Sequence, residues 1–183
     1  MRLASLNQNS NLDLFEILFR QYYDKLFRVA YSITRNKELS KDAVQQAFFQ
    51  AYKKMNHLKD KSKFPAWVTT ITVNEARNMV KSAIRHKVVP ISDEIQMAIE
   101  AGSFEHAYII KDQVTRVLNL LSVDDSEILV LRYYSDLTLE EIASILNITL
   151  SNAKVCLHRA KVNFKEIMSI HDADDMQLGG ITQ

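Results

Sequence analysis

The 183-residue sequence contains little of what tight turns, disulfides or membrane spans require. Only three glycines and two prolines are present, which leaves few residues suited to the many turns of an all-β fold. Because Cys156 is the only cysteine, no internal disulfide is possible, as is usual for proteins of the cytoplasm. No apolar run approaches the roughly 20 residues that span a bilayer, and the N-terminus has no signal-peptide core. We therefore expect an all-α, cytoplasmic protein with no membrane insertion of its own.

The usual signatures of catalysis and cofactor binding are also missing. The five histidines lie far apart, and no two of them have the spacing of a metal site on a helix. Three glycines cannot supply a glycine-rich phosphate loop. We expect no catalytic residues, no metal and no cofactor, and hence a protein that is not an enzyme.

The net charge of +1 hides a strong asymmetry along the chain. Residues 1–87 contain 16 Lys and Arg against 7 Asp and Glu, a net charge of +9, whereas residues 88–183 contain 7 against 15, a net charge of −8. Solvated helix faces would account for such charges, but the asymmetry also suits a basic module that binds nucleic acid. The second half would then meet DNA only locally.

Lys and Arg are absent from Val88 to Ile110, where four acidic residues, Pro90 and Gly102 occur. Proline and glycine interrupt helices, so this segment predicts an acidic linker, with a short helix near residues 94–100. The expected organisation is two small helical domains at residues 1–87 and 111–170, a linker at 88–110 and a flexible tail at 171–183.

Apolar residues recur at steps of three and four along both halves, which indicates amphipathic helices. In the first half the pattern predicts helices over residues 12–34, 40–55 and 65–86, with Ser40 as an N-cap and Pro65 in a first turn. In the second half it predicts helices near residues 106–121, 125–134, 139–146 and 150–168.

The last two of these helices have the pattern of a helix-turn-helix. Thr138 and Glu141 have the spacing of a capping box, and Asn147 is suited to a left-handed turn residue. Ile148 would fill the core, and Thr149 or Ser151 would cap the second helix. The inner face of the first helix would consist of Leu139, Ile142, Ala143 and Leu146. The second helix would bury Leu150, Ala153, Leu157, Ala160 and Phe164.

The outer face of the second helix has no acidic residue before Glu166, although this half of the chain is acidic. An ordinary helical hairpin explains the apolar seam but not the cap, the turn and the missing acids together. DNA binding by this helix in a major groove is therefore favoured. The predicted contacts are Ser151, Asn152, Lys154, His158, Arg159 and Lys161.

Both halves resemble regions of bacterial RNA polymerase sigma factors of the extracytoplasmic-function type. The segment LSVDDSEILVLRYYSDLTLEEIASILNITLSNAKVCLHRAK resembles sigma region 4, and YDKLFRVAYSITRN, DAVQQAFFQAY and FPAWVTTITVNEARNMV resemble region 2. The order of the two regions, with only a linker between them, is that of the family. The resemblance implies binding to polymerase core and recognition of promoter minus-thirty-five and minus-ten elements, with help in opening the strands.

The resemblance also implies partners and residue roles. The partners would be the polymerase beta-prime clamp helices and beta flap, promoter DNA and an anti-sigma factor. Contacts with the clamp helices are implied for Asp42, Gln45, Gln46 and Phe49. The segment from Asn56 through the helix after Pro65 would capture and read the opened minus-ten strand, as amides, guanidinium groups and aromatic rings bind unpaired bases. Its implied contacts are Leu58, Lys59, Lys61, Lys63, Trp67, Asn74, Arg77, Asn78, Lys81 and Arg85.

The sequence departs from the family pattern at several of these positions. Gln46 replaces a common Glu, Leu58 and Asp60 replace an aromatic residue and a glycine, and Cys156 stands where Arg is frequent. Ser122 replaces the usual proline. An alternative from the residues alone is a stand-alone helix-turn-helix regulator that binds an operator as a dimer, and another is a protein-interaction module that sequesters a sigma factor.

Overall fold

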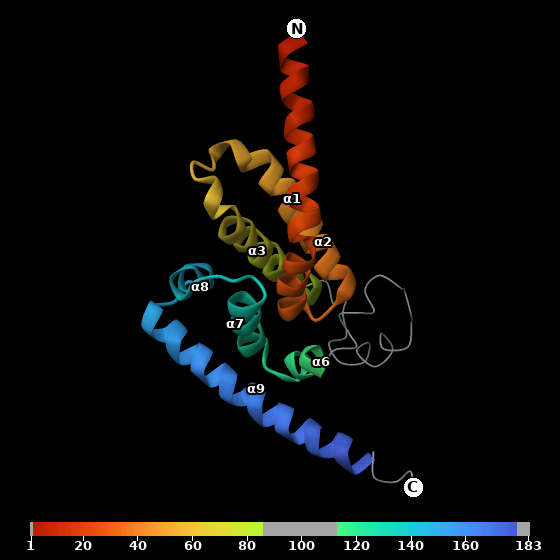
Figure 1. Cartoon of the computed structure of the whole chain (residues 1–183), viewed down its shortest axis with the longest axis vertical. Coiled ribbons are helices and arrows are strands. Elements are labelled where there is room, and N and C mark those ends of the chain that lie inside the picture. The colour runs from red at the N-terminus through yellow and green to blue at the C-terminus, as the bar shows by residue number, and fades with distance from the viewer. Residues whose placement is uncertain (1, 86–112, 179–183) are drawn as a thin grey trace.

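The computed structural model describes the backbone of residues 2–85 and 113–178, and the side chains of residues 15–85 and 114–170. All regular structure within these ranges is helical, which confirms the predicted fold class. The helices form two bundles (Figure 1). We call α1 to α3 the N-terminal bundle and α6 to α9 the C-terminal bundle.

The N-terminal bundle consists of α1 (Arg2–Thr34), α2 (Lys37–Lys54) and α3 (Phe64–Arg85), which all pack against one another. Two short 3₁₀ turns, Met55–His57 and Lys61–Lys63, connect α2 to α3. The first part of α1 projects beyond the bundle (Figure 1). Small residues let the helices approach closely where they cross, because Ala43, Ala47 and Ala76 are fully buried beside larger apolar side chains.

The start of α2 corrects one prediction. Asn36, not Ser40, is the N-cap, since its side-chain oxygen accepts a hydrogen bond from the Leu39 amide at 2.9 Å. The preceding Arg35 has a φ of 52°, so the chain reverses direction in two residues and α2 begins earlier than predicted. Ser40 lies inside the helix, fully buried, and its hydroxyl contacts the Asn36 carbonyl at 2.6 Å.

The C-terminal bundle consists of α6 (Gln113–Leu120), α7 (Val123–Tyr133), α8 (Leu139–Leu146) and α9 (Leu150–Leu178). Helix α9 lies along α6, α7 and α8. It continues to Leu178, well past the end predicted near residue 168, so much of the predicted tail is helical. The predicted linker at 88–110, its short helix and the first residues of the predicted helix at 106–121 lie outside the described residues, as do residues 179–183.

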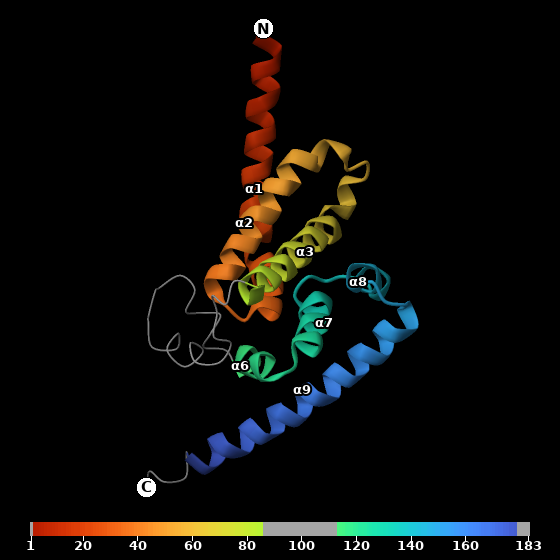
Figure 2. The same cartoon turned by 180° about the vertical axis from the view of Figure 1, so that it is seen from behind.

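The two bundles contact each other along α7. Helix α7 lies against α1, and α8 lies beside α3, as the front and back views both show (Figures 1 and 2). Apolar side chains from both bundles join in a single cluster that includes Leu26 and Val29 of α1 and Ile128 and Leu131 of α7. In the described parts of the chain, no helix combines the length and apolar character needed to cross a membrane.

Candidate nucleic-acid and polymerase interfaces

The turn between α8 and α9 has the predicted helix-turn-helix geometry. The Thr138 amide donates to the Glu141 carboxylate at 2.9 Å and the Glu141 amide donates to the Thr138 hydroxyl at 3.2 Å, which completes the capping box. Asn147 is left-handed, with φ 55° and ψ 47°. Thr149 then caps α9, because its hydroxyl accepts from the Asn152 amide at 3.2 Å. Local hydrogen bonds therefore hold the start of α9 at a defined angle to α8.

The seam between α8 and α9 follows the predicted spacing with some differences. Ala153, Leu157 and Ala160 of α9 are buried against α8 and α7, whereas Leu150 and Phe164 are only partly buried. In α8, Ile142 and Ala143 are buried, and Leu139 and Leu146 are partly exposed. Ile145, absent from the predicted inner face, is buried instead.

The outer face of α9 is exposed along its first three turns. Ser151, Asn152, Lys154, His158 and Lys161 are all exposed, as required of groups that reach DNA. Val155, which is not one of the predicted contacts, lies among them with 65% of its surface exposed. An aliphatic side chain on such a face is suited to contact the methyl group of thymine.

Arg159 is exposed but already paired with an acid of its own bundle. Its Nε and Nη2 atoms donate to Asp125 Oδ1 at 3.2 and 3.0 Å, and Asn163 donates to Asp125 Oδ2 at 2.7 Å. Burial raises the pKa of Asp125, but these hydrogen bonds and one from Ser122 outweigh it, and the pKa is lowered overall. Asp125 therefore stays ionised and joins α9 to the first turn of α7.

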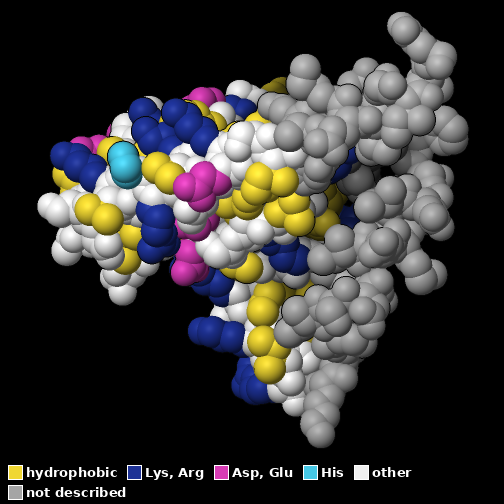
Figure 3. All heavy atoms as spheres, turned by 90° about the horizontal axis from the view of Figure 1, so that it is seen from below, with side chains coloured by type: hydrophobic (Ala, Val, Ile, Leu, Met, Phe, Trp, Pro, Cys, Tyr) yellow, Lys and Arg dark blue, Asp and Glu magenta, His cyan; other side chains and the backbone are white. Residues whose placement is uncertain are grey.

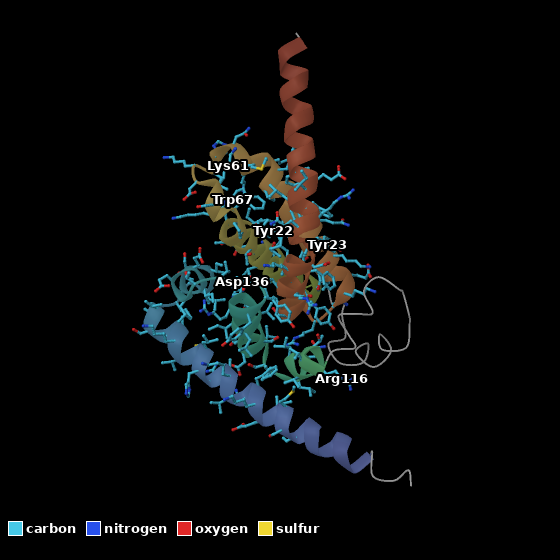
Figure 4. The ribbon with its side chains drawn as sticks, viewed as in Figure 1. Tyr22, Tyr23, Lys61, Trp67, Arg116 and Asp136 are labelled. Carbon is cyan, nitrogen blue, oxygen red and sulfur yellow. The ribbon has the colours of Figure 1, made fainter. Side chains whose placement is uncertain are left out.

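The predicted minus-ten residues lie on the connection between α2 and α3 and along α3. Lys59, Lys61 and Lys63 are exposed, and Lys61 points away from the bundle (Figure 4). Asp60 orders this loop, because its carboxylate accepts from the Ser62 hydroxyl at 2.6 Å and the Ser62 amide at 3.0 Å. Both hydrogen bonds lower the pKa of Asp60, and the one from the Ser62 hydroxyl has the larger effect.

Two of these residues are anchored to the core beside the loop. Leu58 and Trp67 are partly buried, and the Trp67 ring lies 6.0 Å from the Phe64 ring, between centroids. Trp67 is thus partly exposed at the end of α3 nearest the basic loop (Figure 4).

Along α3, Asn74, Asn78, Lys81 and Arg85 are exposed. Arg77 differs, because its Nη2 atom lies 3.1 Å from both carboxylate oxygens of Glu127 on α7. Burial raises the pKa of Glu127, and the nearby Arg77 charge opposes that rise. Arg77 is therefore the one predicted minus-ten residue that the described structure pairs with the C-terminal bundle.

The predicted polymerase contacts lie on α2. Asp42, Gln45 and Phe49 are exposed, and Gln46 is partly buried. Phe49 has 51% of its surface exposed and lies beneath the Lys53 ammonium, 3.9 Å from the ring centroid. A large apolar side chain held in this way on an amphipathic helix is typical of a protein-binding surface.

The C-terminal bundle also has an apolar groove of about 280 Å³ between α6, α7 and α9. Leu118, Leu129, Tyr133 and Phe164 line it, and Lys161 and Lys165 stand at its edge. In the view from below, Lys and Arg side chains are spread over the coloured part of the surface, with hydrophobic and acidic side chains between them (Figure 3). Among the described residues no group of His, Cys, Asp or Glu is arranged to hold a metal ion.

Comparison with known proteins agrees with this arrangement. The Sigma-70 region 2 family matches residues 18–86, and the Sigma-70 region 4 family matches residues 111–163. RNA polymerase sigma factor YlaC of Bacillus subtilis is 27% identical over 161 residues, which cover 86% of this chain and 93% of YlaC. ECF RNA polymerase sigma factor SigM of the same organism is 29% identical over 155 residues, covering 82% of this chain and 92% of SigM.

Solved structures have the same fold. The sigma factor RpoE in complex with the anti-sigma factor NepR from Bartonella quintana superposes with a TM-score of 0.69 at 21% identity, covering 85% of this chain and 97% of that one. CnrH, solved in complex with the cytosolic domain of CnrY, gives a TM-score of 0.62 at 19% identity, covering 94% and 96%.

The chain belongs to the extracytoplasmic-function type of the sigma-70 family, with regions 2 and 4. It is a sigma factor that directs promoter-specific initiation of transcription by RNA polymerase, and the family is not one of enzymes. These findings confirm the predicted family, fold and general function. The residue-level contacts and the domain limits at 87, 110 and 170 stay predictions.

Proposed function

We propose that the C-terminal bundle reads the minus-thirty-five element while the N-terminal bundle captures the opened minus-ten strand. The arrangement that supports this most directly is the capped helix-turn-helix with an acid-free, exposed α9 face. Ser151, Asn152 and Lys154 stand at the start of α9, the end of a recognition helix that meets base edges. Arg159 keeps its pairing with Asp125 and would contact phosphate with its remaining donors, since 55% of its side chain is exposed.

For the minus-ten element, the exposed basic loop and the exposed amides of α3 support strand capture. Lys59, Lys61 and Lys63 would neutralise phosphates, and Trp67 lies partly exposed beside them. Asn74 and Asn78 lie one turn apart on α3, where both are exposed and their amides are suited to bind the hydrogen-bonding edges of unpaired bases.

Binding to polymerase core would use α2 and the groove of the C-terminal bundle. We assign Asp42, Gln45, Gln46 and Phe49 to the beta-prime clamp helices, because they lie on one face of α2 around an exposed ring. The groove of the C-terminal bundle is apolar, so it suits apolar side chains of a protein partner better than the phosphates of duplex DNA. We therefore assign it to the contact with the beta flap. Since RpoE and CnrH were solved with NepR and CnrY, an anti-sigma factor is a further proposed partner, and the cytoplasm is the proposed location.

Two substitutions test this division of roles. Asn74→Ala is expected to reduce promoter opening about tenfold, because losing a base-reading contact costs about 1–3 kcal/mol, while core binding is unchanged. Asp42→Ala is the matched control and is expected to weaken core binding more than opening at saturating core enzyme. Opening is measured by permanganate reactivity of unpaired thymines, and core binding by fluorescence anisotropy. Equal loss of both activities in the Asn74 variant would contradict the assignment.

A further inference from the structure

The Arg159 side chain on α9 is fixed along one edge of its guanidinium group. This group carries five N–H donors in one plane, so it can bind different acceptors along different edges at the same time. Its Nε and Nη2 atoms form one edge, and both donate to Asp125 Oδ1, at 3.2 and 3.0 Å. Nη1 and the second donor of Nη2 form another edge, which this pair does not use. Since 55% of the side chain is exposed, Arg159 keeps these donors for an outside ligand.

The carboxylate that holds Arg159 is itself fixed on α7. Only 5% of the Asp125 side chain is exposed. Its backbone amide donates to the Ser122 hydroxyl at 3.2 Å, within the first turn of α7. Its second oxygen, Oδ2, accepts from Asn163 Nδ2 at 2.7 Å. Asp125 is therefore a rigid acceptor that cannot follow Arg159 away from α7.

The pair between Arg159 and Asp125 is expected to persist when DNA binds. A buried carboxylate that loses its cation keeps the cost of its desolvation without compensation, so Arg159 is not easily drawn away from Asp125. An arginine on an exposed helix face otherwise samples many rotamers, and ordering the side chain on binding lowers the affinity. In this protein the pair orders the side chain before any ligand arrives.

Arg159 lies at the far end of a stripe along the predicted DNA-binding face. Asn152, Val155 and Arg159 follow one another at steps of three and four, and all three are exposed. Seven residues separate Asn152 from Arg159, which is about 10 Å along a helix. The start of a recognition helix meets base edges, so a side chain two turns further on is placed for the sugar-phosphate backbone. A phosphate is therefore the group that the remaining donors of Arg159 would meet.

We propose that Asp125 is a positioning residue for DNA recognition: it holds one edge of Arg159 so that the other edge is presented to a backbone phosphate of the minus-thirty-five element. This inference rests on the proposed phosphate contact of Arg159 and adds the residue that orders it. Because Arg159 is ordered in advance, the contact fixes the register of α9 on the duplex with little further loss of entropy. An acid that merely neutralised Arg159 would have the opposite effect, since removing it would strengthen binding to DNA.

The test uses holoenzyme, which is the full chain with core polymerase. Its affinity is measured by fluorescence anisotropy, at several salt concentrations, for a duplex with the minus-thirty-five element of a promoter that the parent holoenzyme opens. Arg159→Ala is expected to weaken binding about tenfold and to reduce the steepness of its salt dependence by about 0.9 in log K against log salt, the value of one phosphate contact. Asp125→Asn is expected to weaken binding about threefold with the salt dependence kept, because Arg159 retains its charge but loses its order.

A double variant separates positioning from a loss of stability. If Asp125 acts through Arg159, Asp125→Asn has no further effect on DNA binding in the Arg159→Ala protein. If Asp125 only keeps α9 packed on α7, it weakens binding by the same factor in both backgrounds. Asn163→Ala is the matched control, because it removes a bond across the same two helices and leaves Arg159 bonded to Asp125. Its affinity for the duplex should change less than about twofold.

Arg159→Lys tests the same arrangement without altering a buried group. The lysine ammonium keeps the charge but is a single point charge without a second edge, so this variant should bind about as weakly as Asp125→Asn. Circular dichroism checks that each variant keeps its helices, and Arg159→Lys decides the matter if Asp125→Asn does not. The proposal is overturned if Asp125→Asn binds as tightly as the parent or more tightly, if the double variant shows an equal further loss, or if Arg159→Lys binds like the parent.

Lys154→Ala distinguishes a failure of this inference from a failure of the proposed function. Lys154 stands at the start of α9 and should contribute to binding of the same duplex whether or not Asp125 positions Arg159. If Lys154→Ala weakens binding while the Asp125 and Arg159 variants bind like the parent, only the positioning role is wrong. If all of them bind like the parent, the C-terminal bundle does not read the minus-thirty-five element, and both proposals are wrong.

Discussion

Removing the Asp125 carboxylate should loosen α9 from α7. Asp125 accepts two hydrogen bonds from Arg159 and one from Asn163, and only 5% of its side chain is exposed. Because more than half of the Arg159 side chain is exposed, its ion pair with Asp125 contributes only about 1 kcal/mol or less to the stability of the bundle. The bond from Asn163 to a charged acceptor contributes about 1.5–3 kcal/mol. We therefore expect Asp125→Ala to destabilise the C-terminal bundle by about 2–4 kcal/mol.

Hydrogen exchange read by mass spectrometry measures this locally, because the single tryptophan, Trp67, reports only on the N-terminal bundle. Amides of α7 and α9 should lose protection in the Asp125 variant while those of α2 keep it. Asp124→Asn is the control, since Asp124 precedes it in the same helical turn but is exposed. Unchanged protection in α9, or equal losses in the two variants, would refute the role given to Asp125.

The pH dependence has a defined sign. In the folded protein the pKa of Asp125 lies below its usual value of 3.8, so the ionised Asp125 contributes its full stabilisation of the folded state above pH 3.8. It is lost as pH falls through the lowered folded pKa. As the pH falls below about 4, the Asp125→Ala variant should therefore lose less stability of the C-terminal bundle than the parent protein does.

Two further predictions concern exposed apolar side chains. Phe49→Ala should weaken binding to core polymerase about tenfold, measured by fluorescence anisotropy, without lowering the melting temperature, because the Phe49 ring is half exposed. Ile17→Ala is the control, since Ile17 is also an exposed apolar residue, on α1. If Val155 contacts a thymine methyl group, replacing that thymine by uracil should weaken binding of the parent protein to the minus-thirty-five element by roughly two- to tenfold. The same base change should not weaken binding of the Val155→Ala variant. Val162→Ala is the control, since Val162 is also exposed on α9. Additive effects of base and side-chain changes would exclude that contact.

Local signals were sufficient to predict the helix-turn-helix. The capping box at Thr138 and Glu141 and the left-handed Asn147 depend on residues within a few positions of one another, and both are present. The N-cap of α2 was predicted wrongly because Asn36 and Ser40 are both good caps. The choice between them depends on the positive φ of Arg35, which the sequence does not display.

Pairings between distant residues were not predictable from one sequence. Arg159 and Asp125 are 34 residues apart, and Arg77 and Glu127 are 50 apart. Many other acid and base combinations were equally compatible with the composition. The charge asymmetry was interpreted as a preference for nucleic acid, and the structure shows that Lys25, Arg35 and Arg77 also bind the second half of the same chain.

The placement of the two bundles on one promoter can be measured directly. An iron chelate that cleaves nearby DNA is attached at Lys154→Cys on α9 or at Lys59→Cys beside α3, each in the Cys156→Ser background. In complex with core polymerase and promoter DNA, the two proteins should cut at sites about 25 base pairs apart, the first in duplex upstream and the second at the opened strand. Cleavage by both within the same helical turn, or no cleavage by either, would contradict the account.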